Sequence, residues 1–293
     1  MTTFSTNDIP DLSGRRVVIT GANSGIGRSA AQALAAHGAR VTLAVRNLQK
    51  GNQAAASMQG DTTVRQLDLA DLSSVREFAA GWDGEIFLLI NNAGIMIPPL
   101  SRTADGFEMQ FGTNHLGHFA LTNLLLGHVS GRVVTVSSSA HRFGRIDFND
   151  LNWEHKRYRR WPAYGQSKLA NLMFSSELQR RLSEAGSDVI STAAHPGYAA
   201  TNLQSHSGNP LTELLMGKVG NRLLAQDQES GALPTLYAAV ADVPGGAFAG
   251  PSGFQESRGA PKLVGRSKRA LDEEVGKRLW TVSEDLTGTR FPL

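Results

Sequence analysis

The sequence predicts an α/β fold: a single doubly wound, Rossmann-type domain in which helices flank a central parallel sheet of about seven strands. Short apolar runs, typical of buried strands, alternate with helical patterns over most of the 293 residues. Such alternation is typical of βαβ units, whose crossover helices cover both faces of a parallel sheet. The hydrophobic content of 41% can bury the core of such a domain, and no internal repeat at solenoid periods is found.

The strands are predicted from apolar runs, and the helices between them from apolar residues at helical spacing. The expected strands cover 15–20, 40–45, 63–67, 85–90, 132–137 and 188–193, with a short final one near 247–249. The expected helices lie near 25–37, 47–58, 72–81, 104–128, 163–185 and 228–241, with a C-terminal helix over 268–280. The helix at 163–185, for example, has apolar positions at Leu169, Leu172, Met173, Leu178 and Leu182.

The whole chain, residues 1–293, is expected to form one domain. Glycine and proline are dense from Pro244 to Pro261, which predicts irregular structure but no domain boundary. The chain has no cysteine, which excludes thiol nucleophiles, thiolate metal ligands and disulfides within it. Residues 1–13 are largely polar, and no window approaches the roughly 20 apolar residues of a membrane span. We therefore expect a soluble, cytoplasmic protein without a transmembrane segment.

A glycine-rich turn follows the first expected strand. The segment Thr20-Gly21-Ala22-Asn23-Ser24-Gly25-Ile26-Gly27 lies between that strand and an alanine-rich helical pattern. Glycine lets the backbone turn tightly and approach a phosphate closely, and the amides at a helix N-terminus attract the anion. We expect a dinucleotide pyrophosphate to bind here; a plain strand-to-helix connection is the alternative.

Tyr164 and Lys168 are four residues apart within the helical pattern at 163–185, so their side chains are expected on one face of that helix. An unperturbed tyrosine titrates near pH ~10, and a neighbouring ammonium favours the phenolate and lowers that pKa. The pair can therefore act as an acid or a base. The alternative is a surface tyrosine beside a solvated lysine.

Other polar residues follow the ends of expected strands, where a parallel sheet binds its ligands. Ser137-Ser138-Ser139 comes after the strand at 132–137 and is placed to bind a substrate oxygen. Asn91-Asn92-Ala93-Gly94 comes after the strand at 85–90 and is expected to border a cofactor. Asn114 is a polar amide on an otherwise apolar helix, where a buried amide needs a hydrogen-bond partner.

These motifs, in this order, resemble those of the short-chain dehydrogenase/reductase family. The resemblance rests on TGANSGIG (20–27), NNAG (91–94), Asn114, Ser138, YGQSK (164–168) and PGYAAT (196–201). NHLGHF with LTNLLL (114–126), SSSAH (137–141) and SKLAN (167–171) are most similar to the branch that contains retinol dehydrogenases and protochlorophyllide reductases. The resemblance implies an enzyme that transfers a hydride between a nicotinamide and a carbonyl or alcohol. Its implied catalytic residues are Asn114, Ser138, Tyr164 and Lys168.

The resemblance also implies the cofactor-binding residues. Together with Arg46, they are Gly21, Asn23, Ser24, Gly25, Ile26, Gly27, Asp68, Leu69, Asn91, Ala93, Gly94, Tyr164, Lys168, Pro196, Gly197 and Thr201. Arg46 follows the second strand, where many NAD-binding proteins have an acid for the ribose 2′-hydroxyl. A guanidinium suits a 2′-phosphate instead, so NADP(H) is expected in preference to NAD(H); a surface cation is the alternative. Asp68 is expected near the adenine ring, or otherwise as the cap of the next helix.

In the expected reduction, NADPH delivers a hydride to a carbonyl carbon, Tyr164 donates a proton to the developing alkoxide, and Ser138 hydrogen-bonds the same oxygen. Ser137 or Ser139 is the alternative to Ser138. Lys168 is expected to lower the Tyr164 pKa and, by resemblance, to bind the nicotinamide ribose, with Asn114 holding a water chain behind it. Oxidation is equally allowed chemically. A catalytically silent NADP(H)-sensing or scaffold protein is the alternative function, although every catalytic position is filled.

The expected substrate is a lipophilic carbonyl or alcohol, such as a retinal-like, steroid-like or aliphatic aldehyde or ketone. The resemblance implies a lid at about 202–226, which here is rich in apolar residues: Leu203, Leu211, Leu214, Leu215, Met216, Val219, Leu223 and Leu224. The apolar pocket is expected to include Ile95, Met96, Ile97 and Phe143. Packing or an oligomer contact is the alternative role of these residues.

Nucleic acid and metal are not expected as ligands. The net charge is only +3, and the basic cluster His155-Lys156-Arg157-Tyr158-Arg159-Arg160 is expected to be a solvated face. The histidines at 115, 118, 141, 195 and 206 show no convincing ligand spacing for a metal. By resemblance the chain is expected to form a homo-oligomer, a dimer or tetramer, in which the helices containing Asn114 and Tyr164 pair between subunits.

Overall fold

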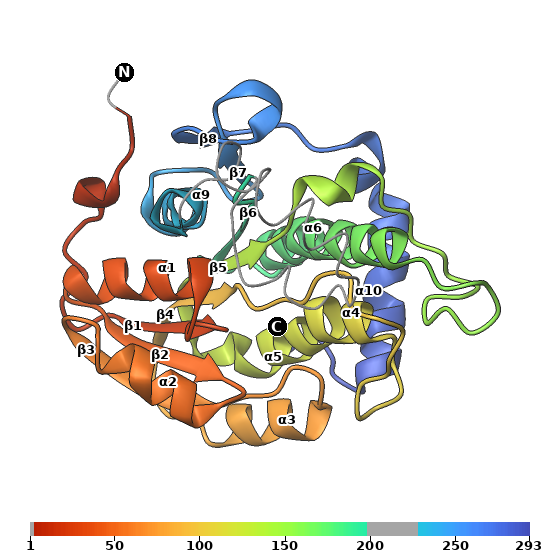
Figure 1. Ribbon diagram of the computed structural model, residues 1–293, viewed down its shortest axis with the longest axis horizontal. Helices are drawn as coiled ribbons and strands as arrows, with labels where there is room; N and C mark the ends of the chain where they lie inside the picture. The colour runs from red at the N-terminus through yellow and green to blue at the C-terminus, as the bar shows by residue number, and fades with distance from the viewer. Residues whose placement is uncertain (1–2, 198–227) are drawn as a thin grey trace, which may run out of the picture.

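The computed structural model describes residues 3–197 and 228–293. One eight-stranded sheet runs through its centre, with helices on both faces (Figure 1). The strand order is β3-β2-β1-β4-β5-β6-β7-β8, and the pairs are parallel except for the last, between β7 and β8. The predicted α/β class, doubly wound around a parallel sheet, is therefore confirmed, with eight strands in place of about seven.

The predicted strands and helices occur within a few residues of their expected positions. The strands are β1 (Arg16–Thr20), β2 (Arg40–Val45), β3 (Asp61–Gln66), β4 (Ile86–Asn91), β5 (Val129–Val136), β6 (Ile190–Ala194), β7 (Phe248–Pro251) and β8 (Pro261–Leu263). The helices are α1 (Gly25–Ala36), α2 (Leu48–Ala55), α3 (Leu72–Ala80), α4 (Met109–Phe111), α5 (Gly117–Leu125), α6 (Arg160–Glu184), α9 (Gln228–Val240) and α10 (Glu273–Thr287). The predicted lid falls almost wholly within the gap at 198–227 and lies outside the described residues.

Two predictions for the C-terminal region were wrong. The last helix begins at Glu273 instead of 268, because Asp272 caps it by accepting a hydrogen bond from the Val275 amide at 3.1 Å. Residues 268–271 form a separate 3₁₀ turn before that cap. The Gly/Pro-rich stretch at 244–261, expected to be irregular apart from a short strand near 247–249, contains that strand as β7. It also leads into β8, which the sequence did not predict because three residues give too short a pattern.

Alternating side chains of the strands build a core on each face of the sheet. In β1, Val17 and Ile19 belong to the cluster that α1, α2 and α9 cover, whereas Val18 belongs to the cluster under α3, α5 and α6. All three side chains are fully buried. The near-continuous apolar pattern of these strands is what a sheet covered on both sides requires.

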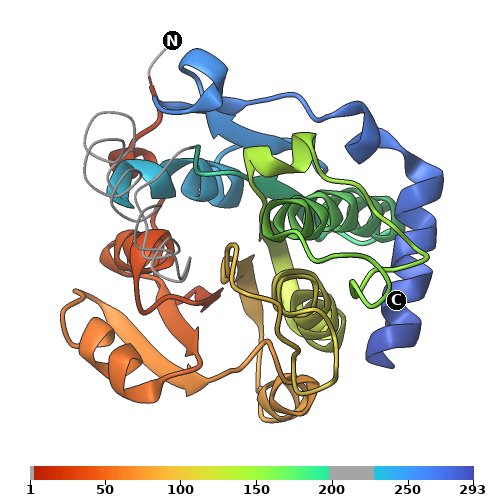
Figure 2. The same ribbon diagram turned by 45° about the vertical axis from the view of Figure 1, so that its right-hand side comes forward.

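The helix α6 is enclosed by the rest of the chain. Every residue from 163 to 175 is buried, including the polar ones. The helix is enclosed on all sides there, so its sequence separates only weakly into an apolar and a polar face. Its cover includes α10, the blue helix beside it in Figure 2. The Trp280 ring of α10 lies 5.6 Å from the Phe174 ring of α6 and 4.9 Å from the Phe119 ring of α5. The helices expected to pair between subunits are therefore covered by α10 of the same chain.

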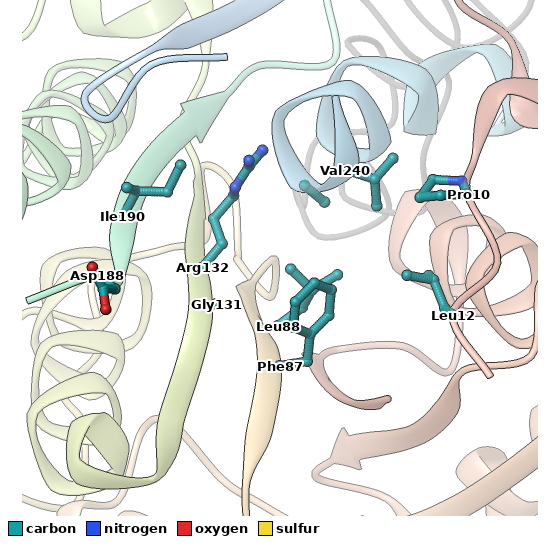
Figure 3. Close-up of a pocket in the computed structure, with 10 residues that line it drawn as sticks. Pro10, Leu12, Phe87, Leu88, Gly131, Arg132, Asp188, Ile190 and Val240 are labelled. Carbon is teal, nitrogen blue, oxygen red and sulfur yellow. The ribbon is translucent and has the colours of Figure 1, made fainter. Parts of the chain in front are cut away.

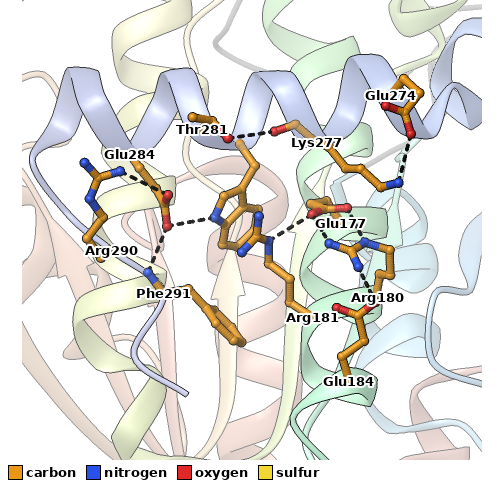
Figure 4. Close-up of polar contacts among 11 residues, drawn as sticks. Glu177, Arg180, Arg181, Glu184, Glu274, Lys277, Thr281, Glu284, Arg290 and Phe291 are labelled. Atoms are coloured by element: carbon orange, nitrogen blue, oxygen red, sulfur yellow. Dashed lines mark hydrogen bonds and ion pairs between the residues drawn. The ribbon is translucent and has the colours of Figure 1, made fainter.

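Arg181 joins α6 to α10 through a contact between its charge and an aromatic ring (Figure 4). Within α6, the buried Glu177 carboxylate accepts hydrogen bonds from Arg180 and Arg181, at 2.6 Å and 2.9 Å. The Arg181 guanidinium in turn lies 4.5 Å from the Trp280 ring centroid of α10, and the Trp280 indole donates to Glu284 of the same helix at 3.0 Å. The buried Glu177 charge is paired and hydrogen-bonded, and it holds Arg181 where it meets Trp280.

The single long helix expected at 104–128 is interrupted. Residues 104–107 precede the helix, and Glu108 caps α4 by accepting from the amides of Gln110 and Phe111. Between α4 and α5, residues 112–116 form a π-helical turn in which the Gly117 amide donates to the Gly112 carbonyl. Such turns are rare and are frequent at functional sites. Asn114 lies at the centre of this one.

Candidate active site

The candidate site lies at the carboxyl edge of the sheet. Strands β1, β4, β5 and β6 are parallel neighbours, so their ends bring together Thr20, Asn91, Ser137 and His195. The chain order reverses between β1 and β4, since β2 and β3 continue on one side and β4 to β6 on the other. Ligands of open parallel sheets bind at such switch points.

The glycine-rich turn packs directly against the loop that follows β4. Gly21 and Gly25 have φ of +67° and +57°, which favour glycine. A Cβ at Gly27 would lie 2.3 Å from Nδ2 of Asn92, and one at Gly21 would lie 3.0 Å from Cα of Ala93. Asn23 and Ser24 complete the turn before α1, while Ile26 is buried in its first turn. This close-packed, glycine-rich turn at a helix N-terminus fits a dinucleotide pyrophosphate.

The loop Asn91-Asn92-Ala93-Gly94 is held by β1. The Thr20 hydroxyl oxygen accepts from the amides of Asn92 and Ala93, both at 2.9 Å, and the Asn92 side chain donates to the Thr20 carbonyl at 2.8 Å. The Asn91 side chain points elsewhere, because it is fully buried and donates to the Thr122 hydroxyl of α5 at 2.8 Å. Asn91 thus serves the packing beneath the loop, and Ala93 and Gly94 are the residues that the loop presents.

Gly94 marks where the loop meets the catalytic candidates. A Cβ at this position would lie 3.3 Å from Oδ1 of Asn114 and 3.3 Å from Nζ of Lys168. The structure therefore brings Gly94, Asn114 and Lys168 together, although they are far apart in the sequence. A side chain at residue 94 would press on both groups, so a glycine lets the loop, Asn114 and Lys168 lie this close together.

The three consecutive serines after β5 have different surroundings. Ser137 is buried and donates to the Lys168 carbonyl at 2.7 Å, and Ser139 is exposed at the start of a 3₁₀ turn. Ser138 caps that turn and is hydrogen-bonded to the Tyr164 side chain, which counteracts the rise of the Tyr164 pKa. Of the three, Ser138 is the one that shares a site with Tyr164.

Tyr164 and Lys168 lie together as their spacing predicts, but burial dominates their titration. Burial raises the pKa of Tyr164 to about 12, and the Ser138 hydrogen bond opposes it. Burial also lowers the pKa of Lys168 to about 8. The Lys168 ammonium lies 5.8 Å from the Tyr164 ring centroid and donates to the Val136 carbonyl at 3.2 Å. Burial and the Ser138 hydrogen bond are the causes that act on the Tyr164 pKa, and the predicted lowering by Lys168 is not found.

Asn114 holds the loop after Gly94 against α6. Its side-chain oxygen accepts from the Ile95 amide at 2.8 Å, and its amide nitrogen donates to the Ile95 carbonyl at 3.0 Å and to the Ser167 hydroxyl at 2.9 Å. All side-chain hydrogen-bonding groups of this fully buried amide are satisfied within the chain. Ser167, which stands between Tyr164 and Lys168, is a contact that sequence reasoning missed.

The other predicted cofactor residues lie along the same edge. Arg46 is exposed directly after β2. The Asp68 carboxylate accepts from the Ala70 amide at 2.9 Å, and α3 is instead capped by Asp71, so the alternative role of Asp68 as that cap was wrong. Leu69 is buried, with its carbonyl against Gly117.

The turn after β6 is fixed by residues that the sequence did not single out. Gly197 has φ of +69° and its amide donates to Nδ1 of His195 at 3.2 Å. Nε2 of His195 in turn contacts the Glu256 carboxylate at 3.0 Å, which also pairs with Arg142 at 2.8 Å. Pro196 lies between the two, whereas Thr201 is outside the described residues. No local pattern links 142, 195 and 256, so only the fold could reveal this contact.

Apolar side chains border the site on the side of α6. Phe143 and Trp161 are 52% and 45% exposed, and their ring centroids lie 6.5 Å apart. The ring centroid of Trp161 is also 6.3 Å from that of Tyr164. The exposed aromatic pair therefore lies next to Tyr164. Ile95, Met96 and Ile97 are half-buried, and the Ile97 amide is held by Gln110 at 2.8 Å. The predicted apolar residues of the lid belong to the part of the chain that is not described.

A separate cavity lies at the opposite edge of the sheet (Figure 3). Its volume is about 260 Å³, and it is lined near the amino ends of β4, β5 and β6 by Phe87, Arg132 and Ile190. It is therefore not the candidate site. Within 3–197 and 228–293, no group of three metal-ligating side chains is found, and no helix is both long and apolar enough to cross a bilayer.

Comparison with known proteins decides the family. A model of the short chain dehydrogenase family matches residues 15–211. The chain belongs to the short-chain dehydrogenase/reductase family. It is 44% identical to human retinol dehydrogenase 13 over 96% of this chain and 87% of that protein, and 43% identical to human retinol dehydrogenase 12 over 96% and 88%. The predicted resemblance to the retinol dehydrogenase branch is thereby confirmed.

Solved structures of short-chain dehydrogenases agree with the fold. A crystal structure of an uncharacterized protein from Mycobacterium paratuberculosis superposes with a TM-score of 0.88 at 52% identity, and each chain is covered completely. A gluconate 5-dehydrogenase structure from Beutenbergia cavernae, with bound NADP at low occupancy, has a TM-score of 0.60 at 25% identity and covers 81% of this chain and 95% of its own. The chain is thus an oxidoreductase of this family with a nicotinamide cofactor.

Proposed function

We propose that this short-chain dehydrogenase/reductase uses NADPH to reduce a lipophilic aldehyde or ketone, of the retinal-like kind, to the alcohol. The observation that carries the proposal is the grouping of four side chains around the catalytic helix. Ser138 bonds Tyr164, the Lys168 ammonium lies 5.8 Å from the Tyr164 ring centroid, and both Lys168 and Asn114 lie against Gly94. These groups can bind a carbonyl oxygen, give it a proton and hold a nicotinamide ribose.

The residues of the site divide the reaction among them. When bound, the nicotinamide supplies the hydride. The Tyr164 hydroxyl donates its proton to the oxygen that becomes the alcohol, and Ser138 hydrogen-bonds the same oxygen. A Tyr164 pKa near 12 keeps the phenol protonated at neutral pH, which suits a proton donor. Lys168 and Asn114 hold Tyr164 and the ribose in place.

The NADP(H) preference is proposed from Arg46. An exposed guanidinium at the end of β2 can form charge-assisted hydrogen bonds with a 2′-phosphate. We expect Arg46→Asp to weaken NADPH binding about tenfold or more, since such a bond contributes roughly 1.5–3 kcal/mol, and to leave NADH binding nearly unchanged. Fluorescence titrations with NADPH and with NADH give the ratio of the two dissociation constants. Arg28→Asp is a matched control on α1, and an unchanged ratio in Arg46→Asp would remove the basis for this preference.

The lipophilic substrate is proposed from the surroundings of Tyr164 and from the relatives. Phe143 and Trp161 present aromatic surface next to Tyr164, and two relatives carry the name retinol dehydrogenase. Flat, conjugated and apolar chains pack well against such rings. Polar sugars would leave the aromatic pair in water.

The test is NADPH consumption against a panel of retinal, aliphatic aldehydes, steroid ketones and small polar ketones, with NADH alongside. Turnover of the apolar carbonyls that needs Tyr164 supports the proposal. Activity confined to polar ketones would contradict the substrate class. Tight NADPH binding with no turnover of any carbonyl would favour the silent sensing or scaffold function.

A further inference from the structure

A directional chain of buried hydrogen bonds connects the loop after β4 with the catalytic helix. Thr20, at the end of β1, accepts from the amides of Asn92 and Ala93. Its oxygen also contacts Nε2 of His118 at 2.9 Å, and Nδ1 of the same ring contacts the Asn114 carbonyl at 2.9 Å. Thr20, His118 and Asn114 are each at most 1% exposed. The imidazole ring therefore joins Thr20, which holds the loop after β4, to the turn that contains Asn114.

The chain continues from Asn114 into α6. The Asn114 amide donates to the Ser167 hydroxyl at 2.9 Å, and that hydroxyl donates to the Tyr164 carbonyl at 2.9 Å. Hydrogen bonds run in one direction from the loop amides to the Asn114 carbonyl, and a second pair runs from the Asn114 side-chain amide to the Tyr164 carbonyl. The covalent bonds of Asn114 join the two series. Hydrogen bonds that are aligned in this way polarise and strengthen one another in a buried site.

The surroundings of His118 select one protonation state of its ring. A carbonyl can only accept, so Nδ1 carries the proton that bonds Asn114. The Thr20 oxygen already accepts two amides, so its own hydrogen points to Nε2. The ring is then neutral, in agreement with burial and the Lys168 charge lowering the His118 pKa to about 4. Lys168 is the charged group that faces it, and His115 on the same turn is also neutral, with its pKa lowered to about 3.

We propose that His118 is a positioning residue that joins the cofactor loop to the catalytic helix, holding Gly94 and Asn114 in register with Tyr164 and Lys168. This inference rests on the proposed function, since it acts through the residues assigned there. Its two ring nitrogens have separate tasks. Nε2 secures Thr20 and hence the loop that borders the nicotinamide, whereas Nδ1 secures the carbonyl of Asn114 in the π-helical turn.

The two tasks can be separated by substitution. His118→Asn places an amide near Nδ1 and keeps the bond to the Asn114 carbonyl, but it loses the acceptor for Thr20. His118→Gln places its oxygen near Nε2 and keeps the acceptor for Thr20, but it loses the bond to Asn114. His118→Phe retains the packing volume and removes both bonds.

We expect His118→Asn to raise the NADPH Kd about tenfold and to keep kcat within about threefold of wild type. His118→Gln should instead lower kcat about tenfold and keep the NADPH Kd within about threefold of wild type. A tenfold change in Kd is what the loss of one buried hydrogen bond is expected to cause. A misplaced catalytic group is expected to lower kcat by a comparable factor. His118→Phe should show both effects. Thr20→Val should raise the Kd more than His118→Asn does, because it also removes the acceptor of the Asn92 and Ala93 amides. Adding His118→Asn to Thr20→Val should raise the Kd no further, because the bond between Thr20 and His118 is already lost.

The matched control is His115→Phe. His115 lies on the same turn and is equally buried, but its Nε2 contacts Ser283 of α10 and it is outside the chain of bonds. Thermal melts identify loss of stability, which all variants can share. Equal changes in Kd and kcat for His118→Asn and His118→Gln, or changes that His115→Phe reproduces, would overturn the proposal. If the wild type turned over no carbonyl, the proposed function would fail while the NADPH Kd still tested the Thr20 task.

Discussion

At the scale of single residues, burial controls the chemistry of the site. Tyr164 and Lys168 are both enclosed, and desolvation disfavours the charged form of each. The phenol is therefore kept protonated and the lysine is brought close to the physiological range. Ser138 favours the phenolate through its hydrogen bond, so it opposes part of the rise in the Tyr164 pKa that burial causes.

Removing the Tyr164 hydroxyl should abolish most of the activity. We expect Tyr164→Phe to lower kcat by roughly 10²–10⁴, the usual contribution of a general acid, because the ring packing stays and the proton donor is lost. NADPH binding should persist. Tyr158→Phe, which removes a hydroxyl bonded to Glu108, is the control. Turnover of Tyr164→Phe near the wild-type rate would rule out Tyr164 as the proton donor.

Lys168 should make the stability of the protein rise with pH above about 8. Its pKa is about 8 in the folded chain and about 10.4 in the unfolded chain, so between these values the unfolded state binds more protons. The free energy of unfolding should increase by about 2 kcal/mol between pH 7 and 9.5 through this residue alone. In urea titrations at both pH values, Lys168→Met should lose this increase. An equal increase in both proteins would contradict the buried, depressed lysine.

At the scale of elements, α10 determines how the catalytic helices are covered. Its Trp280 stacks on Phe174 of α6 with an interplanar angle of 14° and contacts Phe119 of α5 edge-on. Ser283 of α10 also contacts His115 in the π-helical turn. A helix at the end of the chain thus packs against the elements that hold Asn114 and Tyr164.

Truncating Trp280 should destabilise the whole fold. The side chain is 2% exposed, and we expect Trp280→Ala to lower the free energy of unfolding by about 3–5 kcal/mol, as for other large buried aromatics. Trp280→Phe should cost less because it keeps much of the packing. Denaturant titration gives both values. A loss below about 1 kcal/mol for Trp280→Ala would show that α10 contributes little to the cover of α5 and α6.

At the scale of the whole molecule, the chain itself occupies the surface expected to join subunits. Leu124 is the partly exposed apolar residue of α5, at 38%, while residues 163–175 of α6 are fully enclosed. Among the described residues, association through the enclosed face of α6 would therefore have to displace α10. Displacing α10 would expose Trp280 and remove its contact with the Arg181 guanidinium.

The oligomeric state should not depend on the face around α5. We expect Leu124→Glu to leave the mass in solution unchanged in sedimentation or light-scattering measurements, because α10 already covers the pairing surface. Leu271→Glu, at a 61% exposed position before α10, gives a comparison on another surface. A change to a smaller species for Leu124→Glu would show that subunits do pair across α5.

Much of the fold could be predicted because its signals are local. Apolar runs and glycine turns mark strands and their ends, and each of the seven expected strands has a counterpart. The extra strand β8, the π-helical turn and the start of α10 depend on a cap or on contacts from distant segments, which no local pattern contains. Tyr164 and Lys168 were found by their spacing, and Asn114 and Ser138 by the family resemblance. His118, Glu256 and Trp161 acquire a role only from their neighbours.

The sequence by itself determined the α/β class, the family and the identity of the candidate catalytic residues, because periodicity, glycine positions and motif spacing are written along the chain. Only the tertiary structure decided that Ser138 is the serine beside Tyr164, that Asn91 faces α5, and that α10 covers the catalytic helices. It also decided that the pKa of Tyr164 is raised. Burial and hydrogen bonding depend on residues far apart in the chain, so their balance is set when the segments pack together.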